Sequence, residues 1–266
     1  MVNADDFGFT PDVNRGIIEA HRNGILTATT LMANGDAFDD AVRLAQETPS
    51  LDVGCHLVLI GGRAVQPPYA PLPASVPALL VALAARRINV YGELAAQVRK
   101  ILAAGIRPTH LDTHKHTHLA PPVLDAVARI AAEFEIRWVR RPFDLPTTAR
   151  TSWPQRAAGS AMQMVRPRFH RVLAQHGCRT TDHFAGFRIT GHLRTPELVQ
   201  LIQALPDGVT ELMCHPGYCG PDLRRAPTRL KESRQLELDA LVAPETRQAR
   251  AEAGVELVNY KMLAMS

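Results

Sequence analysis

The order of the predicted elements indicates an α/β fold, a single TIM-like (β/α) barrel that is irregular or incompletely closed. About eight short apolar or β-branched segments alternate with helical segments along the chain. Aspartate and histidine residues recur where several of these segments end, which is the place where β/α barrels carry their functional groups. The length of 266 residues and the hydrophobic content of 46% also suit one barrel of the usual size.

The first sixty residues establish the alternation. Thr10 and Pro11 are typical of a helix start, and Gly24 is typical of its end. A paired acidic segment at Asp5 and Asp6 precedes this helix and reads as the end of a first strand. A strand at 26–32, a helix at 38–46 and a strand at 51–59 are then expected.

The alternation is interrupted by an insertion at about 61–90. Prolines crowd residues 66–78, which predicts a loop. The following helix, 76–85, is apolar on nearly every side, which is typical of a helix buried in protein or in a homodimer contact. The alternative is an exposed lid that contacts a lipid-like substrate or a membrane surface. We therefore interpret 1–266 as one domain that carries a proline-rich, apolar lid.

The remaining elements continue the pattern to the carboxyl end. A break is expected at Pro167 inside one long helix, because proline cannot donate the helical hydrogen bond. Strands are expected at 109–114, 136–140, 182–187, 209–215 and 256–260, and helices at 92–104, 122–134, 155–175, 196–204, 228–242 and 245–253.

Composition excludes several classes of protein. The formal net charge is only +4, and 5% of the residues are aromatic, so neither a phosphate track nor a base-stacking surface for nucleic acid is indicated. The four cysteines form no disulfide framework and no C-x-x-C pair, which favours a reducing cytoplasm. No signal peptide and no apolar run of about 20 residues is present, so a transmembrane helix is not expected.

The predicted strand ends carry Asp5, Asp6, His56, His114 and, further on, Arg140 and His215. Two imidazoles and one carboxylate form the ligand set of a catalytic zinc-type site and leave a position for water. A second carboxylate beside them can act as a general base. The competing interpretations are a capping turn for the two aspartates and hydrogen-bonded core positions for the histidines.

The segment from His110 to His118 leaves several ligand choices open. In an extended chain, residues 110, 112, 114 and 116 share one face. His114 is favoured because it lies where the strand should end, whereas His116 and His118 fall in the next loop, where substrate contacts or supporting roles are expected. A non-specific surface tract that binds metal is the alternative.

Five motifs in register resemble the YdjC-like carbohydrate deacetylases, a family that includes the chitooligosaccharide deacetylases (ChbG). The motifs are Asn3-Ala-Asp-Asp-Phe-Gly8, Asn14-Arg-Gly-Ile17, Gly54-Cys-His56, His110-Leu-Asp-Thr-His-Lys-His116 and Met213-Cys-His-Pro216. Only Met1 and Val2 precede the first motif, so a first strand truncated at its start is expected.

The resemblance implies a β/α barrel that removes an acetyl group from the nitrogen of an amino sugar. It implies a divalent metal held by Asp6, His56 and His114, with Asp5 as the catalytic base and His215 as the acid. It also places Arg140 near the base. Zinc or magnesium is expected, with nickel, cobalt and manganese as further choices for such a ligand set.

The last third of the chain resembles the hopanoid-biosynthesis subgroup (HpnK) more than the chitooligosaccharide one, in Pro216-Gly-Tyr-Cys219 and Arg229-Leu-Lys-Glu-Ser-Arg234. The resemblance implies an N-acetylglucosaminyl hopanoid as substrate, a sugar carried on a polycyclic lipid. A peripheral contact with the inner membrane face through 76–85 would then be expected. The alternatives are chitooligosaccharide deacetylation, a metallohydrolase of another bond such as a phosphodiester, and a non-catalytic protein that binds a sugar or lipid.

Overall fold

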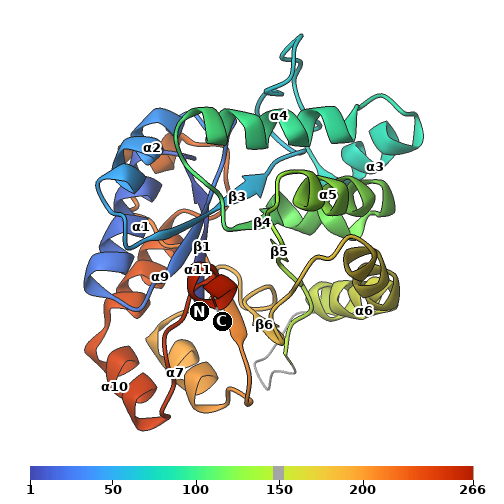
Figure 1. Ribbon diagram of the computed structural model, residues 1–266. Coiled ribbons are helices and arrows are strands. Elements are labelled where there is room, and N and C mark those ends of the chain that lie inside the picture. Colours follow the sequence, from blue (N-terminus) through green and yellow to red (C-terminus); the bar gives the residue numbers. More distant parts are fainter. Residues whose placement is uncertain (146–152, 266) are drawn as a thin grey trace.

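The computed structural model describes residues 1–145 and 153–265, and its centre is one curled, fully parallel sheet (Figure 1). The seven strands of this part of the chain lie in the order β5-β4-β3-β2-β1-β7-β6. Their bounds are Val2–Phe7 (β1), Ala28–Leu31 (β2), Asp52–Leu57 (β3), His110–Thr113 (β4), Trp138–Val139 (β5), His183–Ala185 (β6) and Thr210–Cys214 (β7).

The sheet curls into an incompletely closed barrel, as the sequence predicts. Its edge strands β5 and β6 form no ladder with each other among the described residues. Isolated parallel bridges join Trp138 of β5 to Arg179, and Asp144 to Phe184 of β6. Because all strands are parallel, their carboxyl ends open on the same side of the molecule. The residues predicted at the strand ends are therefore brought to one end of the barrel.

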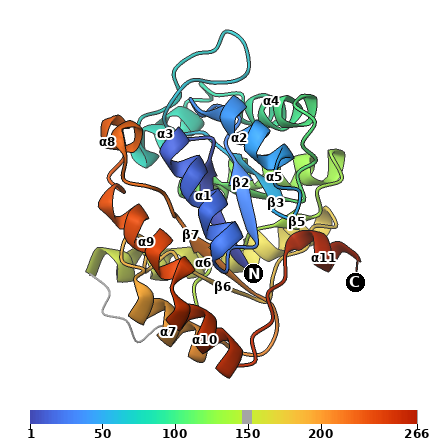
Figure 2. The same ribbon diagram turned by 90° about the vertical axis from the view of Figure 1, so that its left-hand side faces the viewer.

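Helices surround the outer face of the sheet (Figures 1 and 2). Figure 2 shows α1 and α2 in front of strand β2, with α9 beside α1. The bounds are Pro11–Asn23 (α1), Phe38–Gln46 (α2), Val76–Ala84 (α3), Val90–Ala103 (α4), Pro121–Glu133 (α5), Trp153–Gln175 (α6), Thr195–Gln203 (α7), Pro221–Arg225 (α8), Glu232–Val242 (α9), Pro244–Glu252 (α10) and Tyr260–Met265 (α11); a short 3-10 segment, His114–Leu119, follows β4.

The two faces of the sheet differ in chemistry. Along β3, Val53, Cys55 and Leu57 belong to the apolar core beneath the helices, whereas Asp52 and His56 alternate with them. Successive side chains of a strand point to opposite faces, so the second set faces the barrel interior. The interior is therefore polar, and its carboxylates and imidazoles are buried.

The predicted start of the first helix is confirmed. The hydroxyl oxygen of Thr10 accepts a hydrogen bond from the amide of Val13, 3.2 Å away, and Pro11 occupies the first helical position. Such a cap satisfies one of the amides that a helix leaves unpaired at its start.

The predicted strand at 256–260 is wrong. This segment joins no ladder, and α11 begins at Tyr260. The Tyr260 hydroxyl donates to Glu211 at 2.7 Å, and its ring stacks on His110 with centroids 3.9 Å apart. Both contacts lie at the amino ends of their strands, so the segment crosses that end of the barrel and fills it instead of adding an eighth strand.

The predicted break at Pro167 is also wrong, because α6 runs through that residue without interruption. The predicted helix at 228–242 begins later, at Glu232, and a separate short helix, α8, precedes it. Proline at an interior position removes one hydrogen bond, but a helix with 23 residues retains many others.

The insertion leaves the barrel directly after β3 and returns at α4. Two buried side chains of α4 hold the start of the insertion by hydrogen bonds. Gln97 accepts from the amide of Val58 and donates to its carbonyl. Glu93 accepts from the amides of Val65 and Gln66. Among the residues described, no helix combines the length and apolarity needed to cross a bilayer.

We predict that Asn14→Ala lowers the free energy of unfolding by about 2 kcal/mol, because it leaves a buried amide without a partner. Asn14 is fully buried, accepts from the amide of Gly8 at 2.7 Å and donates to the carbonyl of Ala37 at 3.1 Å. Urea unfolding measures the change. The matched control is Asn23→Ala at the exposed end of the same helix, and an equal loss in both variants would contradict the prediction.

Candidate metal centre

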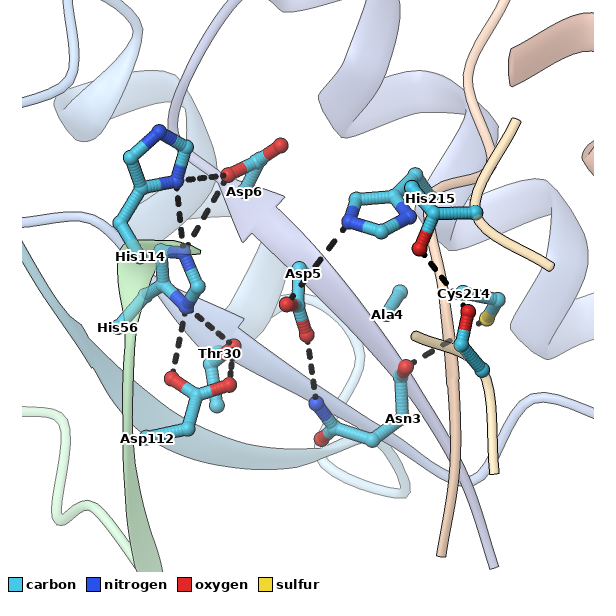
Figure 3. A network of polar contacts seen from close by, with 12 residues as sticks. Asn3, Ala4, Asp5, Asp6, Thr30, His56, Asp112, His114, Cys214 and His215 are labelled. Atoms are coloured by element: carbon cyan, nitrogen blue, oxygen red, sulfur yellow. Dashed lines mark hydrogen bonds and ion pairs between the residues drawn. The ribbon is translucent and has the colours of Figure 1, made fainter. Parts of the chain in front are cut away.

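An irregularity in β1 lets two adjacent aspartates serve one site. The pairing of β1 with β2 shifts register between Ala4 and Phe7, and Asp6 has a φ of +69°. This left-handed conformation is uncommon for a residue other than glycine and is typical of bulges at functional sites. As Figure 3 shows, Asp6 turns toward His56 and His114, while Asp5 points toward His215.

Three ligand atoms converge at the carboxyl ends of β1, β3 and β4. Asp6 Oδ1 lies 3.4 Å from His56 Nε2 and 3.3 Å from His114 Nδ1, and the two ring nitrogens are 3.2 Å apart. Asp6 Oδ1 is buried and has no hydrogen-bond partner among the described residues. The three residues that the sequence predicts as ligands therefore lie together, in a cluster that could hold a cation.

The donor set fits a divalent metal. A tetrahedral ion with bonds of about 2.1 Å separates its ligands by about 3.4 Å, whereas adjacent ligands of an octahedral ion of the same bond length are about 3.0 Å apart. The observed spacings of 3.2–3.4 Å fall closer to the tetrahedral value. The three donor atoms are therefore spaced so that a single divalent ion could contact all of them.

A carboxylate fixes the orientation of His56. Asp112 is fully buried, and its Oδ1 accepts from His56 Nδ1 at 2.7 Å, which leaves Nε2 directed at the cluster. Thr30 donates to the other oxygen of Asp112 at 3.1 Å. This carboxylate-histidine arrangement is the usual support of a metal-binding imidazole. Burial opposes the charged ring, but Asp112 outweighs it and, with Asp6, raises the pKa of His56 to about 10 in the metal-free protein.

Arg140 lies behind the site and not in it. Its side chain is fully buried and forms a two-pronged contact with Asp5, at 2.7 and 2.9 Å. It also contacts Asp112 at 2.5 Å and Glu211 at 2.7 Å. Although burial disfavours the charged form, the guanidinium holds the pKa of Asp5 well below its usual range, so this carboxylate is ionised at neutral pH.

His215 lies between two carboxylates at the end of β7. Its Nε2 is 3.9 Å from Asp5 Oδ2, and its Nδ1 is 3.9 Å from Glu237 Oε2. Glu237 also accepts from the backbone amide of His215 at 2.5 Å. Burial lowers the pKa of His215 to about 4 and raises the pKa of Glu237 to about 7. The imidazole is therefore neutral at neutral pH.

The other histidines of the 110–118 segment do not belong to the cluster. His110 stacks on Tyr260, and its ring fills the space next to Gly54, where a Cβ atom would lie 2.6 Å from it. His118 contacts the carbonyl of Arg140 at 3.1 Å. His116 has a φ of +51°, and its ring packs in T-shaped contacts with Phe184 and Phe187. Of the four candidates on this segment, only His114 meets Asp6 and His56.

Sequence reasoning missed several residues that surround these groups. Asp112 lies on the strand face that the sequence left open for ligands, but its contact with His56 was not predicted. Glu211 and Glu237 carried no signal, because single glutamates within a strand and a helix are ordinary. Arg234 stood in a motif that was noted only as a resemblance, yet its Nη2 donates to Asp6 Oδ2.

The fold and the cluster define a β/α-barrel protein with an Asp-His-His site at the carboxyl ends of its strands. The chain belongs to the YdjC-like protein family, whose model matches residues 1–252.

Two relatives cover almost the whole chain. A protein of Geobacillus stearothermophilus named carbohydrate deacetylase is 36% identical over 98% of this chain and 96% of its own length. A protein of Brevibacillus brevis with the same name is 32% identical over 99% of this chain and 98% of its own length.

Solved structures agree on the fold. A protein of Enterococcus faecalis V583, to which cleavage of cellobiose phosphate has been ascribed, matches with a TM-score of 0.78 and 25% identity over 99% of this chain and 97% of its own. An uncharacterized protein of Agrobacterium tumefaciens C58 matches with a TM-score of 0.52 and 9% identity over 98% of this chain and 87% of its own.

We predict that a divalent ion binds with release of about one proton at pH 7 to 8. Because the pKa of His56 is raised to about 10 in the metal-free protein, its ring carries a proton that the metal must displace. The apparent affinity should therefore rise with pH, by about tenfold per unit below this pKa. Titration calorimetry in two buffers of different ionisation enthalpy counts the protons. Binding that is independent of pH would contradict the prediction.

Proposed function

We propose that this protein is a metal-dependent hydrolase that removes the acetyl group from the nitrogen of an amino sugar. One observation carries the proposal. A three-ligand cluster of Asp6, His56 and His114 lies beside an ionised carboxylate, Asp5, and a histidine, His215, that take no part in it. A protein that only binds a sugar has no need of a base and an acid next to a cation site.

The metal belongs to this proposal because the donor set fits it. Asp6 Oδ1, His56 Nε2 and His114 Nδ1 would hold the ion. When bound, a divalent ion supplies Lewis acidity, which activates water near neutral pH and stabilises charge that develops on the acetyl carbonyl oxygen.

Asp5 is assigned the role of general base. It is ionised at neutral pH, so it can accept a proton from the attacking water. The two-pronged contact with Arg140 fixes its orientation, and Asn3 Nδ2 donates to Oδ1 at 3.3 Å. Arg140 is fully buried, so contact with a substrate is not expected. We therefore assign it a positioning role.

His215 is assigned the role of acid. An amine leaves readily only when it is protonated, and His215 Nε2 lies 3.9 Å from Asp5 on the far side of the carboxylate from the metal ligands. Because burial lowers the pKa of His215 to about 4, the ring is neutral before turnover. The proton that Asp5 accepts from water would pass to His215 Nε2, 3.9 Å away, and the imidazolium would then donate it to the leaving nitrogen. Glu237, close to Nδ1, stabilises that transient positive charge.

The substrate class follows from the relatives, and its finer identity is part of the proposal. Two relatives named carbohydrate deacetylase cover nearly the whole chain, which supports an acetylated sugar. We propose a sugar on a lipid, of the N-acetylglucosaminyl hopanoid type, with chitooligosaccharide as the alternative. The observation that favours a lipid carrier is the apolar insertion.

The insertion presents apolar side chains at the catalytic end of the barrel. It leaves from the carboxyl end of β3, next to His56, and its helix α3 exposes Val76 (41%), Leu80 (52%) and Val81 (63%). Arg86 and Arg87, both exposed, follow this helix directly. Apolar side chains beside cations suit an anionic lipid surface. We propose that segment 61–90 is a lid of a single-domain protein and that α3 makes a peripheral membrane contact.

We predict that Asp5→Asn retains the metal but lowers kcat by about 10² to 10⁴, the usual contribution of a general base. His56→Ala should lose the metal, because it removes one of three ligands. Mass spectrometry measures release of one acetyl group from N-acetylglucosaminyl hopanoid and from chitobiose side by side, and plasma emission spectrometry measures the metal content. Equal metal loss in both variants would refute the division of roles.

The same assay separates the rival functions. Ligand binding without release of acetate over long incubation would support a non-catalytic protein. Cleavage of a model phosphodiester, with no acetate from either sugar, would support a different metallohydrolase.

We predict that Val81→Asp weakens binding to vesicles that contain anionic lipid, with chitobiose deacetylation unchanged, because the substitution places a charge on the exposed apolar face of α3. Vesicle co-sedimentation measures binding. Met164→Asp on α6 is the control, since Met164 is 83% exposed on another helix. Equal sedimentation of Val81→Asp and the wild type would argue against the membrane contact, and a shift from dimer to monomer would indicate a subunit interface instead.

A further inference from the structure

One turn of helix α9 reaches the candidate metal centre from outside the barrel. Arg234 and Glu237 lie three residues apart, so they point to the same side of the helix. Both are buried, with 1% of each residue exposed. Glu237 contacts His215, as described above, and Arg234 contacts Asp6. None of the predicted site residues lies on this helix.

Arg234 is an unusual residue to bury here. Its Nη2 donates to Asp6 Oδ2, whereas its Nε and Nη1 are buried with no hydrogen-bond partner among the described residues. The guanidinium carbon lies 5.9 Å from the ring centre of Phe9. A buried cation with two unpaired nitrogens costs stability. The stability of the fold therefore does not explain why an arginine is buried at position 234. We explain it by the contact with Asp6.

The contact divides the two oxygens of Asp6. Oδ2 is occupied by Arg234, and Oδ1 is left without a hydrogen bond, facing His56 Nε2 and His114 Nδ1 (Figure 3). The left-handed backbone of Asp6 sets the direction of the carboxylate but not its rotation about the last side-chain bond. A donor on Oδ2 fixes that rotation.

We propose that Arg234 is a positioning residue that holds Asp6 so that only Oδ1 serves the metal. The second oxygen is then kept away from the ion, and the remaining coordination positions stay open for water and substrate. This inference rests on the metal of the proposed function, but it concerns the protein's own carboxylate and is tested without a substrate.

The charge of Arg234 and its orienting contact are expected to change the metal affinity in opposite directions. A guanidinium next to a cation site repels the cation, so its removal should tighten metal binding if charge alone mattered. If Arg234 orients Asp6, its removal should weaken metal binding instead. The sign of the change in affinity therefore distinguishes orientation from charge.

The experiment measures the dissociation constant for Co²⁺ and Zn²⁺ by competition with a chromogenic chelator. The variants are Arg234→Met, which keeps the apolar stem but removes the donor, and Arg234→Lys, which keeps a donor and the charge. Arg225→Met is the control, because Arg225 has a side chain 75% exposed and its ion pair among the described residues is with Asp222 in its own short helix. Thermal unfolding of the metal-free proteins is recorded in parallel.

We expect Arg234→Met to weaken metal binding by about 10-fold to 100-fold, the usual effect of removing a group that orients a metal ligand. Arg234→Lys should recover most of the affinity, Arg225→Met should match the wild type, and cooperative unfolding of the metal-free protein should persist in all three.

Unchanged or tighter binding in Arg234→Met would overturn the inference, and so would a metal-free Arg234→Met protein that no longer unfolds cooperatively. A wild-type protein that binds neither ion would instead remove the metal from the proposed function, so the two failures are distinguished by the wild type alone.

Discussion

Burial of negative charge is the constraint on which the rest of the site depends. Among the described residues, five buried carboxylates surround the candidate metal centre, on Asp5, Asp6, Asp112, Glu211 and Glu237, and the buried guanidinium groups that contact them are those of Arg140 and Arg234. Two like charges about 4 Å apart repel by about 4 kcal/mol at an effective dielectric constant of 20. That value is a large part of the 5–15 kcal/mol by which domains are stable. The metal-free protein reduces the excess of buried negative charge by holding a proton on His56. A divalent ion would reduce this excess further, because it would replace one positive charge by two.

Arg140 and Arg234 compensate the buried negative charge in different ways. Arg140 bridges Asp5, Asp112 and Glu211, so a single cation ties together strands β1, β4 and β7 across the interior. It thereby orients both the candidate base and the carboxylate that supports His56. In the part of the chain that the structure describes, the Arg234 guanidinium pairs with one carboxylate, that of Asp6, and two of its nitrogens have no hydrogen-bond partner. The contacts of Arg140 can serve both the stability of the fold and the site. The contact of Arg234 is explained only by its effect on the candidate ligand Asp6.

The barrel could be predicted from the sequence, and so could the gathering of the six candidate site residues at one end of it, because both leave local signals. Alternating strands and helices show in periodicity, and Asp5, Asp6, His56, His114, Arg140 and His215 all stand where a predicted strand ends. The missed features are non-local. The segment 256–260 has strand-like composition, but its place across the end of the barrel is decided by contacts of Tyr260 with His110 and Glu211, far away in sequence. Arg234 lies on a helix whose packing beside α1 no local pattern reveals, and the left-handed turn at Asp6 depends on the register of β1 against β2.

Two parts of the fold therefore position different side chains of the site. The strands of the barrel supply the ligands and the candidate base, and their spacing is fixed by backbone ladders that tolerate little change. Helix α9 lies outside the sheet and contributes two contacts to the described site, from Arg234 to the candidate ligand Asp6 and from Glu237 to the candidate acid His215. Because both contacts come from a single helical turn, a displacement of α9 would alter the metal ligand and the acid together. The effects of substitutions at Arg234 and Glu237 on activity should accordingly not be additive, since both residues depend on the position of the same helix.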